Sequence, residues 1–423
     1  MAKFEFKYGK KAISVNISDE GMIGVLQGKT LAPLRDTAAK IKRTLNYPID
    51  SPKFHDVFKS GDKVAIVVSD RTRNSGAKFI LPVVINELNS IGIKDEDIFA
   101  VLACGTHRTH TKEEHTKLVG EEVIKRVRIF DHDCDDEKNL VELGTTSRGN
   151  KVKLDKRVVE ADKVILTGAI TYHYFAGYGG GRKSVLPGIS AFETIQTNHK
   201  LLIKDGKVEK NCTTGRLEGN PVHEDMIEAA KMLGPDFLVN TIMTSDGRVA
   251  AVFAGDFIAA HLAGCEFLNA NLKVDISQKS DLVIAASGGG GKDLNFVQSH
   301  KAMENASYAL KDGGVMVLIA ESSEGFPSDE YLKWINLGSS KAILDELAKN
   351  FTIGGHTVYA AFRKAEKFKI IWVSKLDSRV ISKMGIIPRD NIAAALDEAY
   401  RLAGENPSTY VMPQGYNTLP NLI

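Results

Sequence analysis

The chain has 423 residues, of which 43% are hydrophobic and 26% are charged, and its formal net charge is +2. These values are typical of a globular protein with two or three domains, and they give no electrostatic reason to expect nucleic acid or a membrane surface as a partner. The sequence has no apolar run long enough to span a bilayer, its first residues lack the apolar core of a secretory signal, and its four cysteines form no C-x-x-C pair. We therefore expect a cytoplasmic protein with reduced thiols.

The N-terminal part of the sequence alternates strand-like and helical segments. Phe4, Phe6 and Tyr8 alternate with polar residues ahead of Gly9, which predicts a β-hairpin. Short and nearly continuous apolar runs then predict strands that are buried on both faces, at 63–69, 98–103, 127–130 and 164–169. Helical patterns accompany them at 77–90, 112–125, 190–203 and 220–233. This alternation is typical of parallel βαβ units.

A second series of the same kind begins near residue 275. Its strand-like runs are 281–286, 315–320 and 368–373, and a long helical stretch at 256–273 connects the two series. We therefore predict an α/β fold with two α/β domains, residues 1–270 and 271–423, each built on a mostly parallel, Rossmann-like sheet. The active site is expected in a cleft between the two domains.

Four of the predicted strands are followed by glycine, basic or titratable residues. In open α/β sheets, ligands bind beyond the carboxyl ends of the strands, so these segments are candidates for one site. The segments are residues 70–73, 105–108, 171–173 with the glycine cluster behind it, and 288–291.

The most informative segment is 171–188, TYHYFAGYGGGRKSVLPG. Its clustered glycines are Gly177, Gly179, Gly180 and Gly181. Glycine lets backbone N–H groups approach a phosphate closely, so these residues, with Lys183 beside them, suggest a phosphate or nucleotide cradle. The segment is not a P-loop, because Arg182 stands where that motif requires its second glycine. The alternative is a flexible loop with a solvated Arg-Lys pair.

Two histidines, His107 and His173, each follow a predicted buried strand. A histidine at a strand end can act as a general base near neutral pH, and the alternative is a polar residue that merely ends the strand. His199 lies on a predicted helix and, on spacing alone, would be a solvated side chain.

Further histidines suggest a metal site only weakly. His107, His110 and His115 in HRTHTKEEH match no standard zinc motif, and Thr111 reads as the N-cap of a helix, so we expect His110 and His115 to be surface residues. His132 stands in an acidic segment that we interpret as a solvated loop.

Two further groups have the chemistry of an anion site. Asp70 and Arg73 stand close together after a strand, and arginine can grip a carboxylate or phosphate through two parallel hydrogen bonds. Gln298 and Lys301 are three residues apart, which places them on one face of a helix. The alternative for this second pair is an ordinary polar helix face.

Taken together, these segments resemble the nickel-pincer-nucleotide-dependent lactate racemase family, whose members are 2-hydroxyacid racemases and epimerases. The resemblance covers nearly the whole chain. It is carried by HYFAGYGGGRKSVLPG with Thr197-Asn198-His199, and supported by the motifs D-x-T-R at 70–73, G-T-H-R at 105–108 and Q-x-x-K at 298–301.

The resemblance implies how the cofactor is held. Lys183 would be joined covalently to the thioamide of a pyridinium-3-thioamide-5-thiocarboxylic acid mononucleotide, which holds the nickel. His199 would be the one protein ligand of nickel, the other donors being a carbon and two sulfurs of the cofactor. The glycines at 177–181 would hold the cofactor phosphate. Other proteins make this cofactor, so transient contact with its biosynthetic enzymes is implied as well.

The resemblance also implies a mechanism. His107 and His173 would be paired acid/base residues, one for each enantiomer of a small 2-hydroxy acid. Hydride would pass to the cofactor and return to the other face of a 2-keto acid, with the protein positioning and protonating the substrate. Arg73 and Lys301 would hold the substrate carboxylate. Gln298 would support the substrate and Asp70 the cofactor side.

The sequence departs from the family pattern in two places. Asn74 replaces a proline that often follows D-x-T-R, and His356 stands at the best match for a tryptophan near the substrate of lactate-specific members. Malate or another larger 2-hydroxy acid therefore stays open as the substrate. Two other functions also stay open: a nucleotide-using transferase or kinase, and a non-catalytic module that carries the cofactor.

Overall fold

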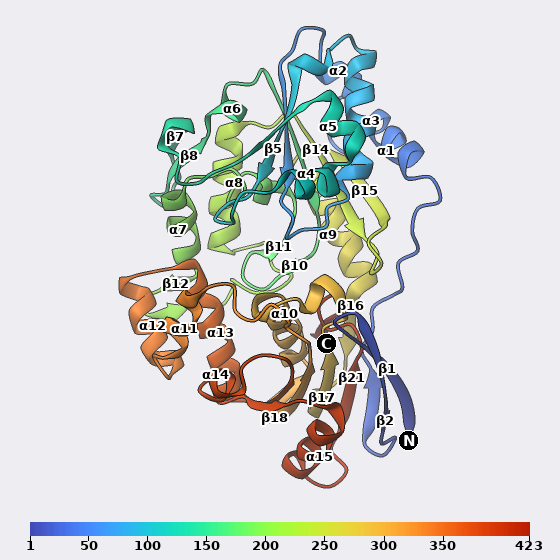
Figure 1. Ribbon diagram of the computed structural model, residues 1–423, viewed down its shortest axis with the longest axis vertical. Helices are drawn as coiled ribbons and strands as arrows, with labels where there is room; N and C mark the ends of the chain where they lie inside the picture. The colour runs from blue at the N-terminus through green and yellow to red at the C-terminus, as the bar shows by residue number, and fades with distance from the viewer. The chain divides into compact units, whose positions relative to one another are not determined.

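A computed structural model describes residues 1–423, except for the side chain of Ile353. The chain forms two compact units (Figure 1). Unit 1 comprises residues 1–29, 203–208 and 271–423, and unit 2 comprises residues 30–202 and 209–270. The prediction that residues 1–29 belong to the N-terminal domain is wrong, because strand β3 (Met22–Val25) pairs in parallel with β21 (Thr409–Met412) of the C-terminal sheet.

Unit 2 is built on a six-stranded sheet in the order β15-β14-β9-β4-β5-β6. Neighbouring strands are parallel except for the antiparallel pair β14 and β15. The strands are β4 (Val64–Ser69), β5 (Ile98–Ala103), β6 (Arg128–Asp131), β9 (Lys163–Ala169), β14 (Phe237–Met243) and β15 (Val249–Gly255). Four of the six were predicted within a residue or two, but β14 and β15 were not.

The helices of unit 2 are α1 (Thr37–Asn46), α2 (Phe54–Val57), α3 (Ala77–Ser90), α4 (Lys112–Val119), α5 (Glu121–Arg126), α6 (Lys156–Val159), α7 (Phe192–Lys200), α8 (Pro221–Leu233) and α9 (Ala259–Leu272). The single helix predicted at 112–125 is two helices. Gly120, at φ +91°, separates them, because the left-handed region that favours glycine interrupts the helical turn. Two small hairpins, β7 (Leu140–Thr145) with β8 (Lys151–Asp155) and β10 (Tyr172–His173) with β11 (Gly177–Tyr178), complete the unit.

Unit 1 is built on a second six-stranded sheet, in the order β20-β19-β18-β17-β21-β3, in which every neighbouring pair is parallel. Its other strands are β17 (Ser280–Ala286), β18 (Leu310–Ile319), β19 (Lys369–Val373) and β20 (Ile387–Arg389). The helices are α10 (Phe296–Ser307), α11 (Asp329–Ile335), α12 (Ser340–Lys349), α13 (Ile353–Lys367), α14 (Ser378–Ser382) and α15 (Ile392–Ala403). The α/β fold with two mostly parallel sheets is therefore confirmed.

The predicted N-terminal hairpin is present in unit 1. β1 (Ala2–Tyr8) pairs antiparallel with β2 (Lys11–Ile17), and Gly9 turns the chain at φ +55°. Two further short pairings are β12 (Ile203–Lys204) with β13 (Lys207–Val208), and β16 (Lys273–Ile276) with β22 (Leu419–Leu422).

The period-2 alternation of side chains explains why the central strands are continuous apolar runs. In β17, Val283 and Ala285 join the core formed with α10–α14, whereas Leu282 and Ile284 join a second core with α15 and the hairpin residue Phe6. Both faces of the sheet are therefore covered, and the strand has no polar face to show in its sequence.

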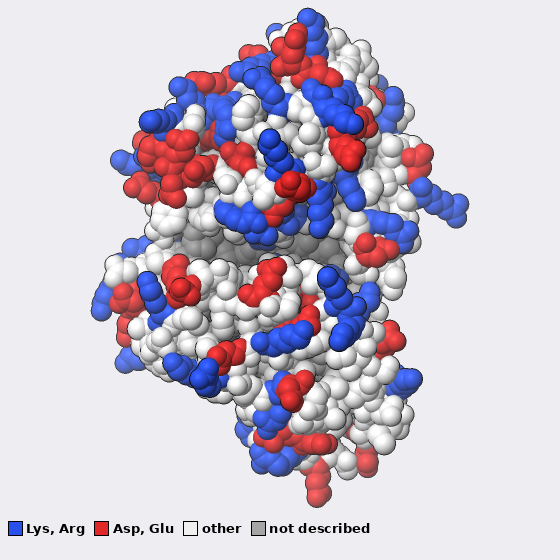
Figure 2. Space-filling model, viewed as in Figure 1, with Lys and Arg blue, Asp and Glu red and all other residues white. Residues whose placement is uncertain are grey.

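The surface carries charges of both signs. On the face shown in Figure 2, Lys and Arg side chains are interspersed with Asp and Glu side chains over both units. Among the described residues, no helix is long and apolar enough to cross a membrane. All four cysteines are buried and form no disulfide.

Candidate active site

The two strand ends that carry the first predicted site residues meet at one edge of the unit 2 sheet. β4 and β5 are parallel neighbours, and Ser69 pairs with Ala103 at their carboxyl ends. In the loops that follow, Asp70 Oδ2 accepts a hydrogen bond from His107 Nδ1 at 2.6 Å. Because Nδ1 donates to the carboxylate, Nε2 keeps its lone pair and can act as a base.

Asp70 is a buried carboxylate that stays ionised. Burial alone would raise its pKa, but the hydrogen bond and charge of His107, with Arg73 and Thr72, outweigh burial and hold the pKa of Asp70 below its ordinary value. An ionised carboxylate in this place stabilises an imidazolium on His107. We predicted that Asp70 supports the cofactor, whereas its side-chain partners in the structure are His107 and Thr72.

Arg73 is held beside Asp70 by a turn. Its backbone N–H donates to Asp70 O at 3.0 Å, and its Nη1 donates to Thr72 Oγ1 at 2.9 Å. The guanidinium is partly exposed at the same strand end as His107. A cation there can bind the carboxylate of a small acid.

Three of the predicted site residues lie around the ring of Phe175. The ring centroid lies 4.5 Å from that of His173, 5.1 Å from that of His199 and 5.7 Å from Lys183 Nζ. His173 Nδ1 accepts the N–H of Ala176 at 3.3 Å, so a neutral imidazole carries its proton on Nε2. Phe175 could not be predicted as part of the site, since its only signal in the sequence is its place among other aromatic residues.

The clustered glycines are required by contacts within the protein. A Cβ would meet Arg216 O at 2.2 Å on Gly177, Thr171 Oγ1 at 2.9 Å on Gly179, Asn240 Oδ1 at 2.6 Å on Gly180 and His261 Cγ at 2.7 Å on Gly181. Three backbone N–H groups of the loop also donate within the protein, from Gly179 to Thr171 O, from Gly181 to Asn240 Oδ1 and from Lys183 to Gly180 O. These donors are therefore engaged in holding the loop together.

Arg182 is the buried anchor of this loop. Its side chain is fully buried, its Nη2 donates to Ala176 O at 2.7 Å, and its Nη1 lies 3.2 Å from His261 Nε2. Burial lowers the pKa of Arg182 to about 10. The alternative of a solvated Arg-Lys pair is therefore wrong for Arg182, and its neighbour Lys183 is partly buried.

The segment around Lys183 is fastened to two strands of the sheet. Ser184 Oγ donates to Thr167 O in β9 at 2.7 Å, and Gly105 in the loop after β5 donates its N–H to Gly188 O at 2.9 Å. A Cβ on Gly188 would lie 2.8 Å from Ala103 Cβ, so only glycine allows this close approach. The Lys183 segment and the loop that carries His107 are thus directly connected.

His199 is buried on α7, with 6% of its surface exposed, so it is not the solvated side chain that spacing alone suggested. The preceding Asn198 anchors this helix, because its Nδ2 donates to Asp225 Oδ2 at 2.9 Å and to Val222 O at 3.0 Å in α8. α7 and α8 therefore hold the imidazole of His199 in a fixed place.

Two other histidines, His110 and His132, are more buried than we predicted. The side chain of His110 has no exposed surface, although we predicted a surface residue, and that of His115 is 18% exposed. His132, predicted in a solvated loop, is buried and bonds Asp155 Oδ2 and Ser190 O, each at 3.0 Å. Pairing with carboxylates explains their burial, since a carboxylate partner offsets the loss of water.

Gln298 and Lys301 belong to unit 1, on helix α10. Lys301 Nζ donates to Gln298 Oε1 at 2.9 Å, so the predicted common helix face is present. Lys301 Nζ also donates to the hydroxyl of Tyr416 at 2.9 Å, a partner that the sequence did not reveal. His356, on α13 of the same unit, is buried and stacks on Phe351 with ring centroids 6.0 Å apart.

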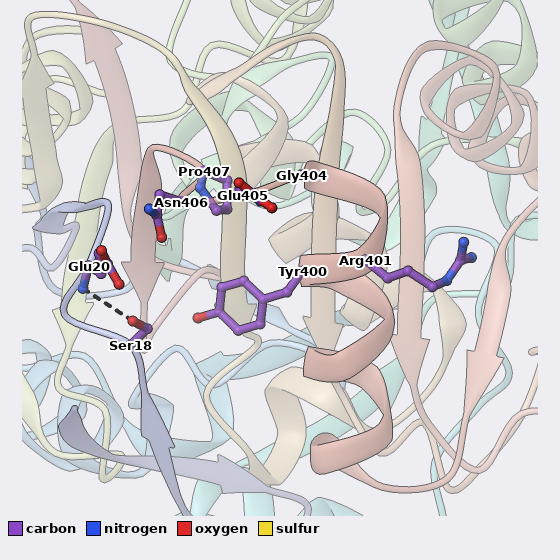
Figure 3. A pocket seen from close by; sticks show the side chains of 8 residues that line it. All are labelled: Ser18, Glu20, Tyr400, Arg401, Gly404, Glu405, Asn406 and Pro407. Carbon is purple, nitrogen blue, oxygen red and sulfur yellow. Dashed lines mark hydrogen bonds between the residues drawn. The ribbon is translucent and has the colours of Figure 1, made fainter.

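Unit 1 also contains an open hollow of about 490 Å³ (Figure 3). It is lined by Ser18, Glu20, Tyr400, Arg401, Gly404, Glu405, Asn406 and Pro407. Ser18 and Glu20 follow β2, and the other lining residues belong to α15 and the turn after it. None of these lining residues is one of the predicted site residues.

Comparison with known proteins finds two domain families that match successive parts of the chain. The lactate racemase N-terminal domain family matches residues 8–211, and the lactate racemase C-terminal domain family matches residues 276–419. The chain is 31% identical over 432 aligned residues to a lactate racemase of Thermoanaerobacterium thermosaccharolyticum, with 99% of each chain covered.

The chain belongs to the lactate racemase family. It is also 30% identical to a lactate racemase of Lactiplantibacillus plantarum, covering 99% of this chain and 100% of that protein. The solved structure of the T. thermosaccharolyticum lactate racemase apoprotein matches with a TM-score of 0.91 at 30% identity, over 99% of this chain and 100% of that one. The family places the chain among the racemases, a class of isomerase.

The lowered pKa of Asp70 predicts how the stability of the protein depends on pH. A depressed folded-state pKa stabilises the protein above the unfolded pKa of about 3.9, and this contribution disappears as the pH falls below that value. We expect the difference in unfolding free energy between wild type and Asp70→Asn to shrink as the pH falls from about 5 toward 3. Denaturant titrations at each pH measure it. A difference that stays constant down to pH 3 would contradict the ionised Asp70–His107 pair.

The packing of Gly181 predicts a large loss of stability when a methyl group is added. Gly181 (φ +56°) and Gly206 (φ +67°) both lie in the left-handed region, but a Cβ on Gly206 meets nothing within 4 Å. Gly206→Ala should cost about 1–2 kcal/mol of strain. Gly181→Ala should cost about 1–3 kcal/mol more, because it overpacks the buried His261 ring. Equal losses in chemical denaturation would show that the loop does not pack as described.

Proposed function

We propose that this chain is a 2-hydroxyacid racemase or epimerase that acts on lactate or a related small 2-hydroxy acid. One observation supports it most: the Asp70–His107 pair stands on the same sheet edge as β9, whose following residues lead to His173 and Lys183. In this proposal, two imidazoles, an amine and a guanidinium would face one small acid at this edge. The buried His356 in unit 1 keeps malate or another larger acid as an alternative substrate.

The proposed cofactor is a nickel-pincer nucleotide attached to Lys183. The residues present suit it, because the amine of Lys183 and the imidazole of His199 lie against the same Phe175 ring. Lys183 would form the covalent link and His199 would coordinate nickel, which readily accepts imidazole nitrogen. When bound, the group supplies an acceptor and donor of hydride.

The glycine loop enters this proposal as a support for Lys183. The N–H groups of Gly179 and Gly181 already donate within the protein, which also counts against a nucleotide-using transferase that would grip a triphosphate with them. Gly177 and Gly180 allow the loop to approach Arg216 and Asn240 closely, so the glycines fix the path of the segment that carries Lys183.

The protein residues would move the hydroxyl proton and hold the substrate. His107 takes the proton of one enantiomer at Nε2, and the buried carboxylate of Asp70 stabilises the imidazolium that forms. His173 serves the other enantiomer and delivers a proton from Nε2 to the oxygen of the 2-keto acid. Arg73 binds the substrate carboxylate, and Lys301 and Gln298 are proposed to assist.

Two further expectations accompany this proposal. The chain acts in the cytoplasm, where the cofactor-biosynthesis proteins contact it transiently. Its other expected partner is the small-molecule substrate.

The covalent attachment is tested by mass. After co-expression with the enzymes that make the cofactor, the wild-type chain should gain the mass of the nucleotide, located by peptide mapping within residues 177–200. Lys183→Arg should gain none, because a guanidinium does not form the amide-type link. Lys200→Arg, an exposed lysine beside His199, is the matched control and should be modified like wild type. An adduct on Lys183→Arg would place the attachment elsewhere.

The acid/base roles are tested by substitution. His107→Ala and His173→Ala should each lower racemisation of the preferred 2-hydroxy acid by about 10²- to 10⁴-fold, because general acid–base catalysis contributes that much. Chiral chromatography of the products measures the rate. His55→Ala, which removes a half-exposed imidazole paired with Glu87, is the control and should remain active. Full activity in both active-site variants would refute the assignment.

A further inference from the structure

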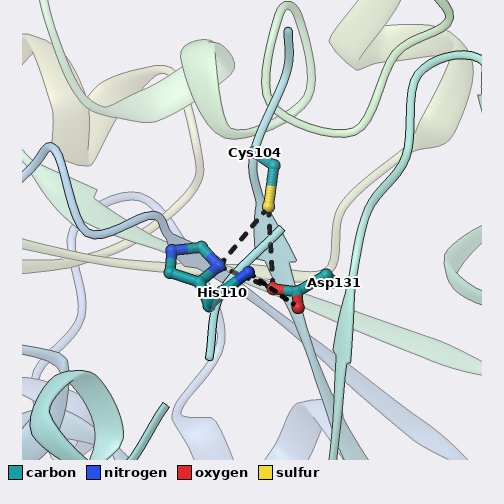
Figure 4. A group of neighbouring side chains, drawn as sticks. All are labelled: Cys104, His110 and Asp131. Carbon is teal, nitrogen blue, oxygen red and sulfur yellow. Dashed lines mark hydrogen bonds and ion pairs between the residues drawn. The ribbon is translucent and has the colours of Figure 1, made fainter. Parts of the chain in front are cut away.

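A second group of polar side chains lies beside the Asp70–His107 pair, at the ends of β5 and β6 (Figure 4). Cys104 Sγ is 3.7 Å from both His110 Nδ1 and Asp131 Oδ1, and His110 Nδ1 is 2.6 Å from Asp131 Oδ1. His115 Nε2 lies 3.0 Å from the other carboxylate oxygen. Thiol, imidazole and carboxylate are the ligand types of a zinc site. The positions of the protons therefore decide whether this group binds a metal ion or forms hydrogen bonds within the protein.

The protons of His110 are arranged for hydrogen bonding. The backbone N–H of Arg71 donates to His110 Nε2 at 3.0 Å, so this nitrogen must present its lone pair. The proton of a neutral imidazole then lies on Nδ1, where it donates to Asp131. A metal on Nδ1 would force the proton onto Nε2, directly against the N–H of Arg71.

The other donors of the group agree with this arrangement. Burial and the nearby charges of Asp131 and Asp70 raise the pKa of the Cys104 thiol far above its ordinary value, which favours the protonated thiol. Burial alone would raise the pKa of Asp131 too, but its hydrogen bonds from His110 and His115 lower it. Asp131 is therefore an ionised acceptor with all its partners in the protein.

His110 joins two strand ends of the unit 2 sheet. Asp131 closes β6, while Arg71 follows Asp70 directly after β4. The side chain of His110 has no exposed surface, and its two ring nitrogens bond to groups that follow different strands. Only a neutral imidazole offers one donor and one acceptor on opposite sides of a rigid ring, which is what this bridge needs.

We infer that His110 is a positioning residue for the acid/base pair: by binding the N–H of Arg71 it fixes the main chain that presents the Asp70 carboxylate to His107. The inference rests on the proposed function. Asp131 in turn sets the tautomer of His110, as a carboxylate does for a histidine in many active sites. The loops after β4 and β5 are therefore joined twice, once through Asp70–His107 and once through Arg71–His110.

The hydrogen bond itself is tested in the chain without cofactor. His110→Leu removes the acceptor and should speed hydrogen–deuterium exchange in peptides covering residues 70–73 by at least about 10-fold. His115→Leu is the matched control, because it removes another histidine that bonds Asp131 and leaves the hydrogen bond from Arg71 to His110 in place. Unchanged exchange in His110→Leu would overturn the inference. So would a stoichiometric zinc ion bound by wild type and lost in Cys104→Ala.

The consequence for catalysis is tested in the cofactor-loaded enzyme. His110→Leu should lower kcat about 10- to 100-fold, because small misplacements of a catalytic group are costly, and KM should stay within about 2-fold. His110→Gln should restore part of kcat, since its amide oxygen can accept the N–H of Arg71. If His110→Leu does not fold, the kcat of His110→Gln is compared with that of wild type instead.

The outcomes separate the two proposals. A kcat for His110→Leu equal to that of wild type would overturn the positioning role even if the exchange rate rises. Equal losses in the leucine and glutamine variants would overturn it too, because a merely structural role predicts no rescue. An inactive wild type would instead refute the proposed function, while exchange at residues 70–73 would still decide whether His110 holds this loop.

Discussion

The hydrogen bond between Asp70 and His107 exists because β4 and β5 are parallel neighbours that end at the same edge of a sheet. In an antiparallel pair, the loops after the two strands would leave from opposite edges, and these side chains could not meet. The remaining features of the candidate site follow from this edge. β9 lies on the other side of β4 and leads into the hairpin of His173, and Gly105 ties the loop after β5 to the Lys183 segment.

The glycine-rich segment shows how one pattern can serve two physical purposes. Glycines beside a lysine are typical of loops that approach a phosphate, yet here each glycine makes room for a protein atom. The buried Arg182 completes this packing through the carbonyl oxygen of Ala176. The loop is thus rigidly held, which suits the proposed covalent attachment of a cofactor to Lys183.

The strands could be predicted from the sequence because both of their faces are buried. Runs such as 281–286 alternate between two apolar cores, so they read as continuous hydrophobic segments. β14 was missed because Asn240 interrupts its apolar run, and that amide turned out to bind the N–H of Gly181. The membership of residues 1–29 in unit 1 could not be predicted, since a pairing between β3 and β21 leaves no local signal.

The candidate site was predictable to the same limited extent. Spacing gave the contact of Gln298 with Lys301, because residues three apart on a helix are neighbours. It could not give the bond of Asp70 to His107, the Phe175 ring between His173 and His199, or the burial of His110. These features depend on how side chains pack in the folded chain, which residue spacing does not determine.

In the proposed mechanism, the histidines exchange the proton of the substrate hydroxyl. The hydrogen on the adjacent carbon moves as a hydride. This division can be measured by letting the cofactor-loaded protein interconvert the enantiomers of a 2-hydroxy acid in D₂O and analysing the product by NMR. We expect racemisation to proceed with the original hydrogen retained on the second carbon. Deuterium appearing at that carbon in step with racemisation would contradict it, because a histidine would then be removing the carbon-bound hydrogen as a proton.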